Sequence, residues 1–212
     1  MSPRPSLALL VVGAFAATGL TGCLSLGGDK ADLAVYAPVI AIAPEATWPS
    51  VPLTLAIAEP QASTALDSVR IAVRPEPGRL QVYAGAVWSD RAPALVQSAL
   101  VDAFDQAGRF KAVTRTTGEL ATDLRLDLDL RQFEAVYADD ADTPTATVVV
   151  QATLVDVRRG TVLATRLFRA GHVAEREKLK AVVPGFEAAL SEVARAMVPW
   201  VLASTPPTGT SG

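Results

Sequence analysis

Leucine alternates strictly with charged residues in the stretch DLRLDLDLRQFEAVY, which predicts a strand over residues 124–137. Four leucines share one face, and four charged residues share the other, solvated face: Leu124, Leu126, Leu128 and Leu130 against Arg125, Asp127, Asp129 and Arg131. The apolar positions then change parity, to Phe133, Ala135 and Tyr137. Because a slip of one residue turns every side chain to the opposite face, the sequence predicts a β-bulge near Arg131 and Gln132.

Shorter apolar alternations predict the other strands, which cover residues 53–57, 69–73, 80–84, 109–115, 145–157 and 161–173. The turn PEPG at 75–78 joins the second and third of these into a β-hairpin. A tight turn at 158–160 joins the last two.

Helical spacing predicts a first helix at 90–107, capped by Ser89 or Asp90, with Pro93 tolerated in its first turn. Its apolar face comprises Leu95, Ala99, Leu100, Ala103, Phe104 and Ala107. Gly108 is the residue type that ends a helix most easily in the left-handed conformation.

A second helix is predicted at about 181–203, with Pro184 in its first turn and Pro199 kinking or loosening its last turn. Its buried face comprises Phe186, Leu190, Val193, Met197, Trp200 and Val201.

The order β-β-β-α-β-β-β-β-α predicts an α+β fold, in which a largely antiparallel or mixed sheet carries both helices on one face. We expect a single domain at 51–204 and a disordered tail at 205–212. Residues 23–50 are predicted to be a tether, with a short edge strand where Val39, Ile40 and Ile42 bring apolar side chains.

The first 22 residues have the three-part layout of a secretory signal peptide: a head with Arg4, an uncharged apolar run at 7–20, and a short junction. The run is about 14 residues long, too short to span a bilayer as a helix. Leu20, Thr21 and Gly22 directly precede Cys23, the only cysteine, and resemble a bacterial lipobox. The alternative is an ordinary signal peptide followed by a chance cysteine.

The lipobox resemblance implies diacylglyceryl and N-acyl groups on Cys23, and two or more chains anchor a protein stably. Leu24, in place of the aspartate that retains many lipoproteins at the inner membrane, favours the outer membrane. Cleavage before Cys23 removes one basic residue, leaving 18 against 22 acidic residues. A mildly acidic chain without a basic block gives no electrostatic case for nucleic-acid binding.

The chain offers no persuasive catalytic or metal site, and we expect no enzymatic activity and no cofactor beyond the covalent lipid. His172 is the only histidine and has no suitable partners at useful spacing for a triad or a metal cluster. Asp127 and Asp129 alternate with arginines, which favours a charge-balanced surface over a carboxylate pair. Three aspartates lie close together at Asp139, Asp140 and Asp142. An acidic turn is a simpler interpretation of them than a calcium-binding loop.

Tyr83 and Trp88 flank a bend of small residues around Gly85, just before the first helix. A corner of the core is the favoured interpretation, and a partner-contact surface is the alternative. The same alternatives apply to Trp200.

The run YAGAVW, followed by Pro93, Leu95, Gln97, Leu100 and GRF at 108–110, resembles the ABC-type transport auxiliary lipoprotein component family, which includes the PqiC-like lipoproteins. The resemblance covers roughly residues 51–203. It implies a non-catalytic, periplasm-facing partner of an ABC permease and ATPase and of an MCE-domain substrate-binding protein, in systems that move lipids or other apolar molecules between the two membranes. It also implies that self-association occurs in some relatives. The alternative function is a stand-alone envelope lipoprotein that binds an apolar ligand itself.

Overall fold

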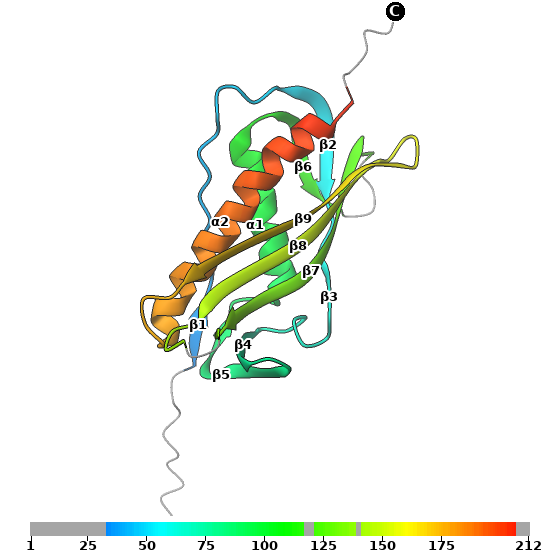
Figure 1. Ribbon diagram of the computed structural model, residues 1–212. Coiled ribbons are helices and arrows are strands. Elements are labelled where there is room, and N and C mark those ends of the chain that lie inside the picture. Colours follow the sequence, from blue (N-terminus) through cyan, green and yellow to red (C-terminus); the bar gives the residue numbers. More distant parts are fainter. Residues whose placement is uncertain (1–32, 117–120, 139–140, 207–212) are drawn as a thin grey trace, which may run out of the picture. The chain divides into compact units, whose positions relative to one another are not determined.

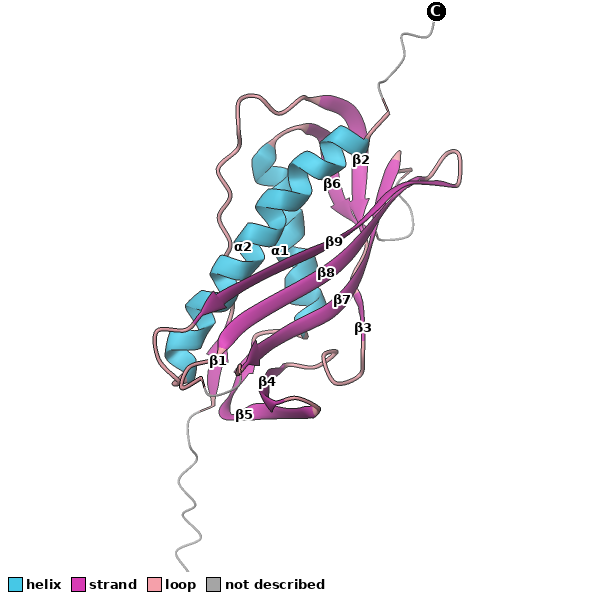
Figure 2. Ribbon diagram, in the orientation of Figure 1, coloured by secondary structure: helices cyan, strands magenta, loops and turns pink. Residues whose placement is uncertain are grey.

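The computed structural model describes residues 33–116, 121–138 and 141–206, which form nine strands and two helices. The strands build one mixed sheet, and both helices lie on the same face of it (Figure 1, Figure 2). The predicted α+β class is confirmed. The elements are β1 (Ala34–Tyr36), β2 (Val51–Ile57), β3 (Gln61–Ala62), β4 (Arg70–Glu76), β5 (Arg79–Trp88), α1 (Ala92–Ala107), β6 (Phe110–Arg115), β7 (Leu124–Val136), β8 (Thr145–Asp156), β9 (Thr161–Val173) and α2 (Leu179–Ser204).

Strand β7 organises the sheet. On one side it pairs antiparallel with β8, which pairs antiparallel with β9. On its other side, successive parts of β7 pair in parallel with three short strands, β2, β3 and β4. Strand β6 also pairs in parallel, and among the described residues its partner is β2 alone, so β6 does not join the β7–β8–β9 meander. The sheet therefore contains more parallel pairing than its short connections suggested.

The predicted β-bulge is confirmed. Leu130 pairs with Val150 and Gln132 with Val149, so that Arg131 is the extra residue in β7. This extra residue lets Phe133 and Ala135 continue on the buried face that the leucines begin.

The folded domain begins before Val51. Strand β1 pairs in parallel with β5, and the segment that follows β1 runs along α2, where the Val39 amide donates to Glu187 Oε1 (3.2 Å). Ile40 and Ile42 are buried in the common core. The edge strand expected at Val39–Ile42 therefore lies earlier in the chain, and the apolar residues there pack against the domain without forming a strand.

Helix α1 begins two residues later than predicted. Its N-cap is Arg91, which makes no side-chain cap, so neither Ser89 nor Asp90 has the predicted role. Gly108 does end the helix in the left-handed conformation (φ 60°).

Helix α2 continues through Pro184 and Pro199 to Ser204, so the predicted loosening at Pro199 does not interrupt it. Burial of Val201 and Leu202 and a hydrogen bond from Thr205 Oγ1 to the Val201 carbonyl (2.8 Å) hold the last turn. Within the described ranges, neither helix is both long and apolar enough to cross a bilayer.

Candidate functional site

The predicted lipid attachment site lies outside the described residues. This holds for Cys23, for Leu20, Thr21 and Gly22 before it, and for Leu24. Asp139 and Asp140 of the acidic turn also lie outside them. The remaining candidate sites are the bend in β5, the open face of the sheet, and the surface between β9 and α2.

The bend in β5 directs Trp88 into the core. Ala72 pairs with Val82 and Arg70 with Val87, so β5 has extra residues between these pairs, and Gly85 takes the left-handed conformation there (φ 69°). Trp88 is only 1% exposed. The centre of its ring lies 5.4 Å from that of Phe133 in β7 and 5.2 Å from that of Phe186 in α2. These contacts connect the sheet to α2. The indole is therefore a packing residue.

Tyr83, at the start of the bend, is half-buried, and this burial raises the pKa of its phenol. Ala84 and Gly85 are exposed. A partner could thus reach the backbone, the small side chains and part of Tyr83, whereas Trp88 is enclosed in the core. Trp200 on α2 is likewise partly buried, with its ring 5.4 Å from that of Phe168.

The face of the sheet opposite the helices is polar and charge-balanced. Arg125 donates to Asp127 (2.7 Å), and Arg131 donates to Asp129 (3.2 Å), as the alternating sequence indicated. These pairs are exposed, so each contributes little to stability. They leave no unpaired carboxylates at Asp127 and Asp129 for acid–base chemistry.

A more buried ion pair on the same face was not foreseen from the sequence. Arg74 Nε and Nη2 donate to the two carboxylate oxygens of Glu134, each at 2.9 Å. The side chain of Glu134 is 2% exposed and that of Arg74 is 31% exposed. The hydrogen bond from Arg74 to Glu134 raises the pKa of Arg74. The change of parity at the bulge was the available signal, because it places Glu134 on the open face beside β4.

We expect Arg74→Met to lower the free energy of unfolding by about 3 kcal/mol, since it leaves the Glu134 carboxylate buried without its cation. Urea unfolding followed by circular dichroism measures this change. In the double variant Arg74→Met/Glu134→Leu most of the loss should be recovered, because a buried pair replaced by apolar groups is often neutral. Equal losses in the single and double variants would contradict this role of the pair.

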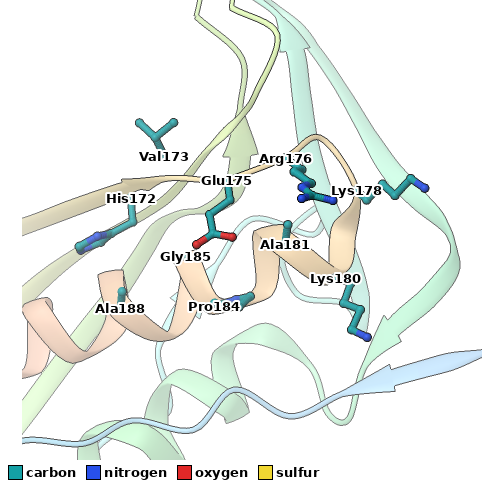
Figure 3. A pocket seen from close by; sticks show the side chains of 10 residues that line it. All are labelled: His172, Val173, Glu175, Arg176, Lys178, Lys180, Ala181, Pro184, Gly185 and Ala188. Atoms are coloured by element: carbon teal, nitrogen blue, oxygen red, sulfur yellow. The ribbon is translucent and has the colours of Figure 1, made fainter.

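Between the end of β9 and the first turns of α2 lies an open depression of about 510 Å³, lined by His172, Val173, Pro184 and Ala188 among others (Figure 3). His172 Nε2 is 3.0 Å from Glu192 Oε2. Lys178 and Lys180, near the start of α2, also belong to its lining (Figure 3). Gly185 allows the close approach of α2, since a Cβ there would lie 3.0 Å from Ala146 Cβ.

The lining of this depression mixes apolar and charged residues, since Arg176, Lys178 and Lys180 line it together with Val173, Pro184 and Ala188. Its lining brings together one histidine and one carboxylate, Glu175, without a hydroxyl or thiol nucleophile beside them. Across the described ranges, no three side chains of His, Cys, Asp or Glu cluster in a way that would hold a metal ion.

Comparison with known proteins identifies the family. The model of the ABC-type transport auxiliary lipoprotein component family matches residues 34–198. The chain belongs to this family. The match begins at β1, which agrees with the start of the folded domain before Val51.

Several solved structures are similar to this auxiliary lipoprotein component, and two of them cover most of the chain. One is the crystal structure of protein XCC0632 from Xanthomonas campestris, which is 36% identical, with a TM-score of 0.76 over 80% of this chain and 95% of that chain. The other, of an uncharacterized protein, is 11% identical with a TM-score of 0.62 over 79% of this chain and 97% of that chain, and shows the fold alone.

Among curated proteins, the uncharacterized protein bll6063 of Bradyrhizobium diazoefficiens is 31% identical over 152 residues. This alignment covers 70% of the present chain and 39% of the relative. The auxiliary lipoprotein therefore spans about two fifths of that protein's length.

Proposed function

We propose that this chain is a lipid-anchored, periplasm-facing subunit of an ABC transport system, held at the outer membrane by acyl groups on Cys23. The observation that carries the proposal is the order of the chain, in which a cysteine after a lipobox-like sequence comes shortly before a domain of the auxiliary lipoprotein family. Leu33 lies ten positions after Cys23. Even fully extended, this stretch reaches about 35 Å, so the anchor holds the domain close to one membrane.

Its role in this proposal is to dock a partner, without catalysis. Tethering raises the effective concentration of the domain for any partner that reaches the same membrane. The partner we propose is an MCE-domain substrate-binding protein, together with its ABC permease and ATPase, and the cargo is a lipid or another apolar molecule. The polar, ion-paired face of the sheet is compatible with contact between soluble protein surfaces.

Co-purification tests this docking role. We expect a tagged copy, extracted in mild detergent from its own bacterium, to retain the MCE-domain protein through washing. The matched control is an unrelated outer-membrane lipoprotein carrying the same tag. Repeated recovery of the chain without any MCE-domain protein, also after chemical crosslinking in cells, would contradict the proposal.

The depression beside α2 favours a second candidate function, direct binding of an apolar ligand. Val173, Pro184 and Ala188 present apolar surface there, although the depression is open to solvent. Native mass spectrometry of the extracted protein separates the two functions. A stoichiometric bound lipid, in addition to the acyl groups on Cys23, would support the second.

A further inference from the structure

Strand β9 is the longest free edge of the sheet. Among the described residues it pairs only with β8, along its whole length of 13 residues (Figure 1). Natural proteins usually shorten, cover or interrupt such an edge, because its free N–H and C=O groups are a template for another strand. Strand β9 contains no proline and exposes Leu167 (43%) and Val173 (70%).

The turn after β8 and strand β9 itself carry charge of one sign. From Val157 to Val173 the charged side chains are Arg158, Arg159, Arg166 and Arg169. Of these, Arg159 is paired with Asp156 (3.1 Å). No carboxylate of the described residues lies within 4 Å of the other three guanidinium groups.

Two of these arginines lie on opposite faces of β9. Arg166 is opposite Ala152 in β8, on the helix side, and its guanidinium lies 5.0 Å from the ring centre of Phe168. Arg169 is opposite Val149, on the open face, and donates to Gln132 Oε1 (3.4 Å). Glu192, on the adjacent helix, is engaged with His172 near the far end of the strand. A strand added beside β9 would therefore lie next to Arg166 on the helix side of the sheet and next to Arg169 on the open side.

We propose that β9 binds an extended, acidic segment of a partner protein, which adds one more strand to the sheet. Backbone hydrogen bonds along the edge would supply affinity, and alternate side chains would supply specificity. The segment that fits has acidic residues opposite Arg166 and Arg169, three positions apart, and an apolar residue opposite Leu167. This inference extends the proposed docking role, and its relevance in the cell rests on that role.

A second copy of this chain fits the edge less well. Self-pairing of β9 brings arginine-bearing strands together, and the free edge of β6 carries Lys111 and Arg115. Cations facing each other across neighbouring strands are destabilising. The charge of the edge therefore favours a different protein.

Hydrogen exchange with defined peptides tests the inference on the full mature lipoprotein in detergent micelles. The probes are the peptide TVETVEVT and its control TVKTVKVT, in which lysines replace the glutamates. We expect the acidic peptide to slow amide exchange within residues 161–173, and the basic peptide to have no such effect. In the variant Arg166→Glu/Arg169→Glu, binding of the acidic peptide should weaken at least about ten-fold, and the basic peptide should become the better ligand. The control variant Arg195→Glu, on the exposed face of α2, should bind like the original chain.

Absence of slowed exchange in β9, or equal slowing by both peptides, would overturn the inference. Slowed exchange that appears without peptide as the protein concentration rises would assign the edge to contact between copies instead. Because the peptide experiment needs neither the transporter nor its cargo, its failure leaves the co-purification result unaffected. Conversely, a chain that binds the peptide but never an MCE-domain protein would refute only the proposed transport partner.

Discussion

Replacing Trp88 with alanine should lower the free energy of unfolding by about 3–5 kcal/mol, the range for removing a large aromatic side chain from a core. Trp88 is 1% exposed and contacts Phe133 from β7 and Phe186 from α2, so the cavity would lie where sheet and helix meet. The surrounding rings come from rigid elements and can relax only partly. Urea unfolding of the purified mature chain, followed by circular dichroism, measures the loss without relying on tryptophan fluorescence.

Two companion variants show whether packing causes this effect. Trp88→Phe should retain most of the stability, because the indole N–H has no hydrogen-bond partner among the described residues and only volume is lost. Leu167→Ala, at an exposed apolar position, should change stability by less than about 0.5 kcal/mol. A Trp88→Ala protein as stable as the original chain would contradict the placement of this residue at the centre of the core.

Replacing residues 1–23 with an ordinary cleavable secretory signal should release the domain from the membrane into the soluble periplasmic fraction. Without acyl chains on Cys23 the mature chain has a charged, folded domain and no apolar anchor that we expect to hold it at a bilayer. Membrane flotation followed by immunoblotting measures the distribution. The matched control keeps Leu20, Thr21, Gly22 and Cys23 at the junction of the same foreign signal and should stay with the membrane. Equal membrane retention of both versions would show that something other than the cysteine anchors the chain.

Local patterns were sufficient to predict most of this fold. The alternating leucines of β7 and their change of parity located the bulge at Arg131, because side-chain period and register are properties of the strand itself. The turns at 75–78 and 158–160 likewise fixed two hairpins. Gly108 marked the end of α1 for the same reason, since its left-handed conformation is a local requirement.

Features that depend on distant partners could not be predicted in this way. Parallel pairing of β2, β3 and β4 with β7 joins segments far apart in sequence and leaves no local periodicity. The apolar alternation predicted a strand at 80–84 but not the environment of its side chains, and Leu80 and Val82 are exposed. The burial of Ile40 and Ile42 depends on α2, which follows about 140 residues later.

The candidate functional residues show the same difference between features set by neighbouring residues and features set by distant ones. The lipobox is a linear motif and was predicted from sequence alone, and the ion pairs of Arg125 and Arg131 follow from neighbours two residues away. The Arg74–Glu134 pair and the free edge of β9 exist only once the strands are ordered in the sheet. A linear sequence can therefore predict a site of lipid attachment, whereas the surface available to a partner depends on the topology.

We propose above that acyl groups on Cys23 fix this auxiliary domain to a membrane. Mass spectrometry of the N-terminal tryptic peptide, recovered from the membranes of the native bacterium, decides whether these groups are present. We expect a peptide that spans residues 23–30 and is heavier than its unmodified sequence by a diacylglyceryl group and an amide-linked acyl chain. An unmodified peptide with a free Cys23 thiol, or one that still includes the preceding residues, would contradict the proposal.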